Sequence, residues 1–174
     1  MTYTLQNFSA DTRKSLTTKS EREGPEEVQM HLEKLLVDEG FIAQYAGPDA
    51  EVGKEVIYSD PELGFTVLVY NSRSGRAESA PHDHDDSWAI YGQAKFHTDM
   101  RDWEKLDPSL EGSKADVRVT REYRLDPGQA KLYHQGDIHS IHPSDNCCYV
   151  RVAGTPADGF RPIGRKKEIL WTPA

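Results

Sequence analysis

Hydrophobic positions along the chain change their spacing near residue 41, from a helical repeat to the short apolar runs of strands. Before that point, Val28, Leu32 and Leu35 recur at intervals of three and four residues behind Gly24-Pro25. Proline suits the first position of a helix, and Gly40 offers a stop. The pattern therefore predicts one amphipathic helix at about 25–39, packed on the outside of the β-structure.

Short segments rich in β-branched and aromatic residues follow, each bounded by Gly, Pro, Asn or Asp. They are 55–58, 65–70, 87–91, 117–120, 130–133, 148–152 and 169–171. Residues 98–112 lack alternation, and we expect a long loop there between two halves of the β-structure. Many short strands with a single helix predict an all-β sandwich or barrel, as opposed to an alternating α/β fold.

The polar N-terminal segment, residues 1–23, shows no hydrophobic period, and we expect it to form an arm. The remaining residues, 24–174, are expected to form a single domain, because 174 residues are enough for one domain with a real core.

The charge of the chain limits its partners. A net charge of −8 argues against nucleic acid and against anionic membranes, which both require a cationic surface. No run of eighteen apolar residues predicts a membrane span, and residues 1–7 do not resemble a signal peptide. We therefore expect a cytoplasmic protein. Cys147 and Cys148 are adjacent, so their side chains point to opposite faces of a strand and are expected to be packing residues, not a disulfide.

Histidines carry the clearest chemical signal. His82 and His84 lie two residues apart in β-like sequence and should share one face of a strand. His139 follows a Gly-Asp turn on a later strand and can close a triangle around one metal ion. Neutral imidazole suits iron, zinc, copper and nickel. An alternative ligand set adds Asp85 or Asp86, which gives two histidines and one carboxylate, with or without His139.

The spacing of these histidines resembles the two motifs of cupins, which are small double-stranded β-helix (jelly-roll) barrels. The first motif is similar to Gly75, six residues, then His82-x-His84; the second is similar to Gly128, five residues, His134-x-Gly136, two residues, then His139. The resemblance covers residues 64–154. It implies an all-β cupin barrel, to which the spacing of residues 25–39 adds one N-terminal amphipathic helix, and it implies a homodimer.

Within the cupins, the chain most resembles the cysteine-dioxygenase-like branch, the thiol dioxygenases. The usual cupin glutamate is missing, since Trp88 and Ala89 occupy its position. The resemblance implies Fe(II) held by His82, His84 and His139, with zinc or nickel as other occupants. It also implies O2 and a small thiol as substrates, with both oxygen atoms added to sulfur.

The chain departs from that branch at its catalytic relay, which falls here on Tyr149, Arg151 and Ala153, and no arginine lies near Tyr58 to hold a substrate carboxylate. We expect Arg151, facing inward, to replace that arginine.

Tyr149 and His134 complete the expected catalytic set, with His134 a candidate proton relay. Two alternatives stay open. The same metal could serve carbon–carbon dioxygenation, isomerisation or lyase chemistry, or the protein could bind a ligand or metal without catalysis.

Overall fold

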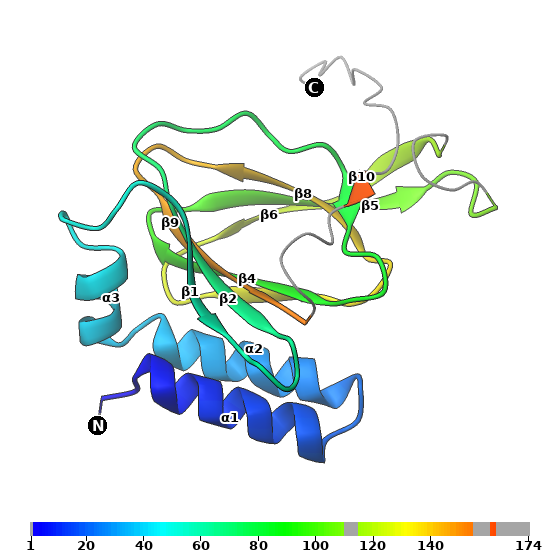
Figure 1. The fold of residues 1–174 in the computed structure, drawn as a ribbon. Coiled ribbons are helices and arrows are strands. Elements are labelled where there is room, and N and C mark those ends of the chain that lie inside the picture. Colours follow the sequence, from blue (N-terminus) through cyan, green and yellow to red (C-terminus); the bar gives the residue numbers. More distant parts are fainter. Residues whose placement is uncertain (1, 110–114, 155–160, 163–174) are drawn as a thin grey trace.

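The computed structural model describes residues 2–109, 115–154 and 161–162, and in this part of the chain the helices precede all of the strands (Figure 1). The helices are α1 (Leu5–Thr18), α2 (Glu23–Leu35) and α3 (Glu39–Tyr45). The strands are β1 (Gly53–Ser59), β2 (Thr66–Asn71), β3 (His82–Asp83), β4 (Ala89–Lys95), β5 (Thr98–Lys105), β6 (Val117–Leu125), β7 (Ala130–Tyr133), β8 (Ile138–Pro143), β9 (Cys148–Ala153) and β10 (Arg161–Pro162).

The strands form two antiparallel sheets that face each other. The first has the order β1-β2-β9-β4-β7 and the second the order β10-β3-β8-β5-β6. Without β1 and β10, the remaining eight strands give four in each sheet, which is the double-sheet arrangement of a jelly roll. Two antiparallel sheets agree with the β-rich fold that the short apolar segments predicted.

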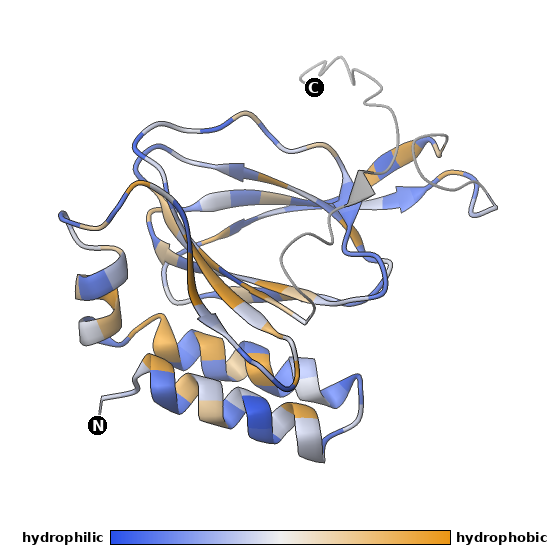
Figure 2. Ribbon diagram, viewed as in Figure 1, coloured by the Kyte–Doolittle hydropathy of each residue, from blue (hydrophilic) through white to orange (hydrophobic). Residues whose placement is uncertain are grey.

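The first sheet is covered on its outer face by α1 and α2 (Figure 1). Phe8 of α1 and Leu32 of α2 join Val67, Ile90 and Val150 in one buried cluster. Hydrophobic residues accordingly concentrate on this sheet and on the sides of the helices that face it (Figure 2). The strands read as continuous apolar runs because both faces of this sheet are covered.

A second, smaller cluster lies between the two sheets. It contains Tyr91, Met100, Tyr133, Ile141 and Tyr149, among others. This inner core is rich in tyrosine, whose hydroxyl groups need partners when they are buried. The space between the sheets is therefore more polar than the interface with the helices.

The expectation of an N-terminal arm and a single helix is wrong for the residues that form α1. Thr4 caps the helix, since its side chain accepts a hydrogen bond from the amide of Asn7, and Phe8 is fully buried. Thr12 and Ser15 are also buried against α2. Small polar side chains on the packed face hid the helical period, because they lie between Phe8 and Leu16, which also pack against the core.

The predicted helix at 25–39 is present as α2 but ends earlier than expected, and a second short helix follows it. α2 ends at Leu35, and Asp38 caps α3 by accepting a hydrogen bond from the amide of Phe41 at 3.0 Å. Gly40, which was expected to stop the helix, lies in the first turn of α3. The break between the two helices therefore lies at Asp38 and not at Gly40, where the sequence analysis placed the end of the helix.

The loop expected at 98–112 is also wrong, because β5 occupies Thr98–Lys105 and pairs with both β6 and β8. Its outward side chains are charged and pair across strands, as in Asp99–Arg124 and Arg101–Glu122. These charges obscured the alternation. The segment 169–171, predicted to be a strand, lies outside the described residues. No helix in the described ranges is long and apolar enough to cross a membrane.

Candidate metal site and its cavity

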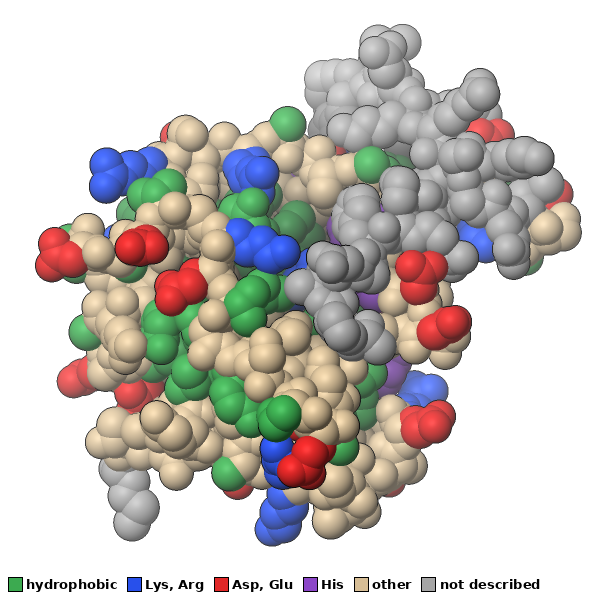
Figure 3. Space-filling view, viewed as in Figure 1, with side chains coloured by type: hydrophobic (Ala, Val, Ile, Leu, Met, Phe, Trp, Pro, Cys, Tyr) green, Lys and Arg blue, Asp and Glu red, His purple; other side chains and the backbone are tan. Residues whose placement is uncertain are grey.

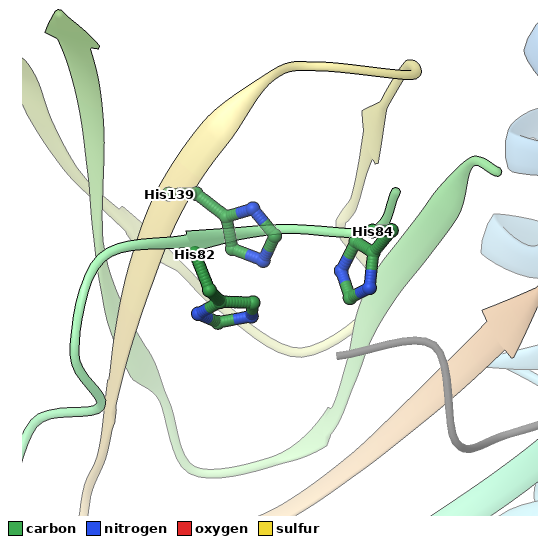
Figure 4. A group of neighbouring side chains, drawn as sticks. All are labelled: His82, His84 and His139. Atoms are coloured by element: carbon green, nitrogen blue, oxygen red, sulfur yellow. The ribbon is translucent and has the colours of Figure 1, made fainter. Parts of the chain in front are cut away.

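Two paired strands of the second sheet bring the three histidines together. His82 of β3 is the direct cross-strand partner of His139 of β8, and His84 follows two residues after His82. The candidate ligand atoms of the three rings all lie within 4.8 Å of one another. The rings project into a common space between the strands (Figure 4).

Tight turns beside the histidines fix their positions. Before β8, the amide of His134 donates to the Asp137 carboxylate at 2.8 Å, and Gly136 has a φ of 81°, which glycine adopts without strain. After β3, Asp85 has a φ of 53° and the amide of Ser87 donates to the carbonyl of His84 at 3.1 Å. The chain therefore turns away directly after His84, while the histidine itself stays on the ligand face.

The hydrogen bond of His82 determines which of its ring nitrogens can bind a metal. Nδ1 lies 2.9 Å from the carbonyl oxygen of Ala80. A carbonyl can only accept, so Nδ1 carries the hydrogen and Nε2 presents its lone pair. A backbone carbonyl behind the ligating ring is a common way to orient a metal-binding histidine.

His139 is the most deeply buried of the three rings and lies in parallel contact with Tyr133, with the ring centroids 3.7 Å apart. Neither of its ring nitrogens has a hydrogen-bond partner of normal geometry within the described residues. Unsatisfied buried nitrogens are costly, and a metal ion would satisfy one of them. The site therefore fits a metal.

Burial keeps His82 and His139 in the neutral form that metal binding requires. Desolvation, followed by the proximity of His82 and His84, holds the pKa of His139 well below its ordinary value. Desolvation also lowers the pKa of His82, and the charge of Arg151 adds to the effect. Neutral imidazoles can therefore bind a cation without first releasing a proton.

The structure does not add a carboxylate to this group. Within the described residues, the cluster of candidate ligands consists of His82, His84 and His139. Asp86 is exposed and accepts a hydrogen bond from Gln135 at 3.0 Å. The set with Asp85 or Asp86 is thus not the one that the geometry brings together.

A cavity of about 570 Å³ opens beside the histidines between the two sheets. His82, Tyr91, Tyr149 and Arg151 are among the residues that line it. Arg151 of β9 is the cross-strand partner of Tyr91 of β4, and its charge opposes the rise in the pKa of Tyr91 that burial causes. The structure thus brings the predicted Arg151 and Tyr149 into the cavity that His82 lines.

His134, in contrast, does not line this cavity. It lies at another depression with Trp88 and Gln135, and its Nε2 is 3.9 Å from a carboxylate oxygen of Glu26 on α2. The expectation that it relays protons at the metal site is therefore wrong in geometry. The expectation was based on the closeness of His134 and His139 in the sequence. The turn at Gly136 lies between the two histidines and separates them in space.

The sequence did not reveal two basic residues of the cavity, Lys54 on β1 and Arg76 in the segment between β2 and β3. Lys54 stands at the start of a half-exposed strand, and Arg76 lies in a segment without period. In the sequence, Lys54 could only be placed on the same face of a strand as Val56. That position does not show that this face borders the cavity.

The fold and the site together define a two-sheet β protein with a buried three-histidine group that could hold one metal ion at a cavity between the sheets.

No family model and no curated protein sequence matches the chain. Solved structures with a similar fold include KdgF from Halomonas sp., at 16% identity and a TM-score of 0.43, covering 66% of this chain and 84% of that one. Another is hydroquinone 1,2-dioxygenase PnpCD in complex with Cd²⁺ and 4-hydroxybenzonitrile, at 12% identity and a TM-score of 0.46, with coverages of 69% and 72%. The cupin domain of Schizosaccharomyces pombe Cnp3 is similar at 10% identity and a TM-score of 0.45, with coverages of 62% and 66%.

Proposed function

We propose that this protein is a cupin-type, metal-dependent oxygenase in which His82, His84 and His139 hold one Fe(II) ion and a small anionic thiol binds beside it. The observation that carries the proposal is the cluster of three buried imidazoles, one of which, His82, lines the same cavity as Arg151. The motif resemblance described above supports the choice of iron and thiol.

The donor set decides which kind of substrate fits. Three neutral imidazoles leave the charge of a divalent ion uncompensated, so an anion is favoured at the remaining positions. When bound, iron would supply a redox-active centre at which O2 and a thiolate can react. The role of the chain is to orient both reactants and to exclude bulk water, which the burial of the three histidines favours.

Arg151 is the residue that we assign to a substrate carboxylate. Its guanidinium offers donors in a planar fork that matches a carboxylate. Leu68 and Tyr91 are its cross-strand partners, so its side chain leaves the strand on the face that lines the cavity.

Tyr91 and Tyr149 would act as hydrogen-bond donors to bound substrate or oxygen. Burial raises the pKa of both hydroxyl groups above the ordinary value. Both tyrosines therefore remain protonated across the working range of pH and can donate a hydrogen bond, but they cannot serve as bases at neutral pH.

Oxygen uptake by Fe(II)-loaded protein against a panel of small thiols, with and without a carboxylate, tests the proposal. Uptake should require His82, so the His82→Ala variant is the blank. Arg151→Gln should raise KM for the carboxylated thiols by about tenfold, since one charge-assisted contact contributes about 1.5–3 kcal/mol. KM for thiols without a carboxylate should stay unchanged.

Failure of uptake with iron fully bound would refute the thiol reaction. Turnover of a carbonyl substrate without O2 would indicate isomerase or lyase chemistry at the same metal. High-affinity binding of zinc or nickel without turnover of any substrate would favour a binding protein.

A further inference from the structure

The charged side chains of the described residues that line the cavity are of one sign. Three cationic side chains line it, Lys54, Arg76 and Arg151, and no carboxylate is among the described residues that do so. This contrasts with the chain as a whole, whose net charge is −8. Cations gathered at a cavity in an acidic protein indicate that its ligand is an anion.

Strand register separates these cations into an outer and an inner level. Lys54, Tyr70 and Tyr149 are cross-strand partners on β1, β2 and β9. Arg151 lies two residues further along β9 and therefore one level deeper, about 7 Å along the strand. It is paired there with Leu68 and Tyr91. The inner cation thus lies on the level of Tyr91, whose ring contacts those of His84 and His139.

The segment that precedes β3 brings Arg76 to the outer level. Its guanidinium lies over the ring of Tyr70, 4.9 Å from the ring centroid, and donates a hydrogen bond to the Tyr70 hydroxyl. Tyr70 in turn stacks on Tyr149, with centroids 5.2 Å apart and planes within 5°. A stacked guanidinium loses less freedom on binding an anion than a fully mobile one would.

Among the described residues, the two outer cations have no acidic partner that would compete with a ligand. Neither Lys54 nor Arg76 forms an ion pair with a carboxylate in the part of the chain that the structure describes. Both side chains are exposed, and they belong to the cavity that His82 also lines. Figure 3 shows Lys and Arg side chains beside hydrophobic side chains near the middle of the face in view.

We propose that Lys54 and Arg76 form a second anion-binding site at the outer end of the cavity, so that the substrate carries two anionic groups joined by an apolar segment. The inner group binds near Arg151 and the metal ion, and the outer group binds Lys54 and Arg76. Leu68 and Ile141, which line the cavity, contact the segment between the two groups. The inner half of this assignment rests on the proposed function, whereas the outer site does not depend on the metal.

Equilibrium binding of matched ligands to metal-free and to Zn²⁺-loaded protein tests the outer site without any turnover. The probes are glutarate and adipate, each compared with its monomethyl ester, which has nearly the same shape and one charge less. Isothermal titration should show that each diacid binds wild-type protein at least tenfold more tightly than its monoester, in both forms of the protein.

Variants at the cavity mouth should remove this preference. Lys54→Gln and Arg76→Gln should each reduce diacid affinity by about threefold to fivefold, as expected for exposed ion pairs. The double variant should bind the diacid no better than the monoester. Arg73→Gln is the matched control, because Arg73 is an exposed cation in the same segment that does not line the cavity.

Equal affinity for diacid and monoester, or a preference that survives in the double variant, would overturn the outer site. The absence of measurable diacid binding would overturn it as well. Binding of the diacids by metal-free protein is unaffected by whether iron supports oxygen uptake, so failure of the outer site and failure of the proposed oxygenase reaction are distinguishable.

Discussion

The two faces of the first sheet differ in role: one packs against the helices, and the other lines the cavity. On β9, Cys148, Val150 and Val152 point toward the helices and join the large apolar core, whereas Tyr149 and Arg151 line the cavity. Because side chains alternate along a strand, the six residues of β9 contribute both to the apolar core and to the cavity. We expect substitutions on the helix side to change the free energy of unfolding, and substitutions on the cavity side to change binding.

Phe8→Ala should give the largest effect, a loss of about 4 kcal/mol in the free energy of unfolding, because Phe8 is fully buried under the first sheet. Urea denaturation of metal-free protein measures this change. Metal affinity of the folded fraction should be unchanged. Met30→Ala on the exposed side of α2 is the control and should shift stability by less than about 0.5 kcal/mol. A Phe8→Ala effect below about 1 kcal/mol would contradict the packing of α1.

His139→Ala should have the opposite profile. Loss of a ligand should weaken metal binding by roughly 100-fold or more, since even the outer partners of metal ligands contribute about 10–100-fold. The apo variant should remain folded, because the apolar core and not the ion carries most of the stability.

Competition with a chromophoric chelator gives the affinity, and far-UV circular dichroism reports the fold. His134→Ala is the matched control, because this histidine lies outside the cavity and should retain full affinity. An equal loss of affinity in both variants would argue against the three-histidine site.

Asp60→Asn tests a charge on the helix side. Burial would raise the pKa of Asp60, but hydrogen bonds from the amides of Leu63 and Glu62 and the charge of Arg13, 2.8 Å away, hold it below the ordinary value. A depressed carboxyl pKa stabilises the fold above about pH 4 and loses that contribution as the pH falls through the folded pKa.

The variant should therefore cost about 1.5 kcal/mol at pH 7 and much less at pH 3. Urea denaturation at the two pH values measures this difference. Glu62→Gln removes the exposed partner of the same arginine and should have little effect at either pH. A cost of Asp60→Asn that does not depend on pH would refute the electrostatic explanation.

Tyr133→Phe should give the smallest effect. It removes a hydrogen bond of 2.5 Å between the hydroxyl groups of Tyr133 and Tyr123, which should cost about 1 kcal/mol. The ring that stacks on His139 remains, so metal affinity should stay within about twofold. A much larger loss of metal affinity would show that the Tyr133 hydroxyl, and not only its ring, supports the ligand.

The three-histidine cluster could be predicted from the sequence because local features encode it. His82 lies on β3, His84 follows directly after that strand, and the Gly136 turn positions His139, so no long-range information was needed to find the three residues. Arg151 was found in the same way, from alternation on β9.

Features that depend on packing between distant segments could not be predicted. The buried face of α1 includes the polar residues Thr12 and Ser15, which are buried only because α2 packs against them. Their polarity concealed this face in the sequence. The alternation of β5 is obscured by charged side chains that form ion pairs with the neighbouring strand β6. Lys54 and Arg76 acquire a common role only when β1 and the segment before β3 meet at the cavity.

The pairing of His82 with His139 also has a consequence for the order in which the molecule assembles. Their strands, β3 and β8, are neighbours in space, but β4 to β7 lie between them in the chain. These four intervening strands belong to both sheets. Closing so long a segment is slow, and it cannot precede the pairing of the intervening strands without a large loss of chain entropy. The three-histidine cluster is therefore expected to be complete only late in folding, so that a metal ion would enter a finished protein and would not serve as a template for the chain.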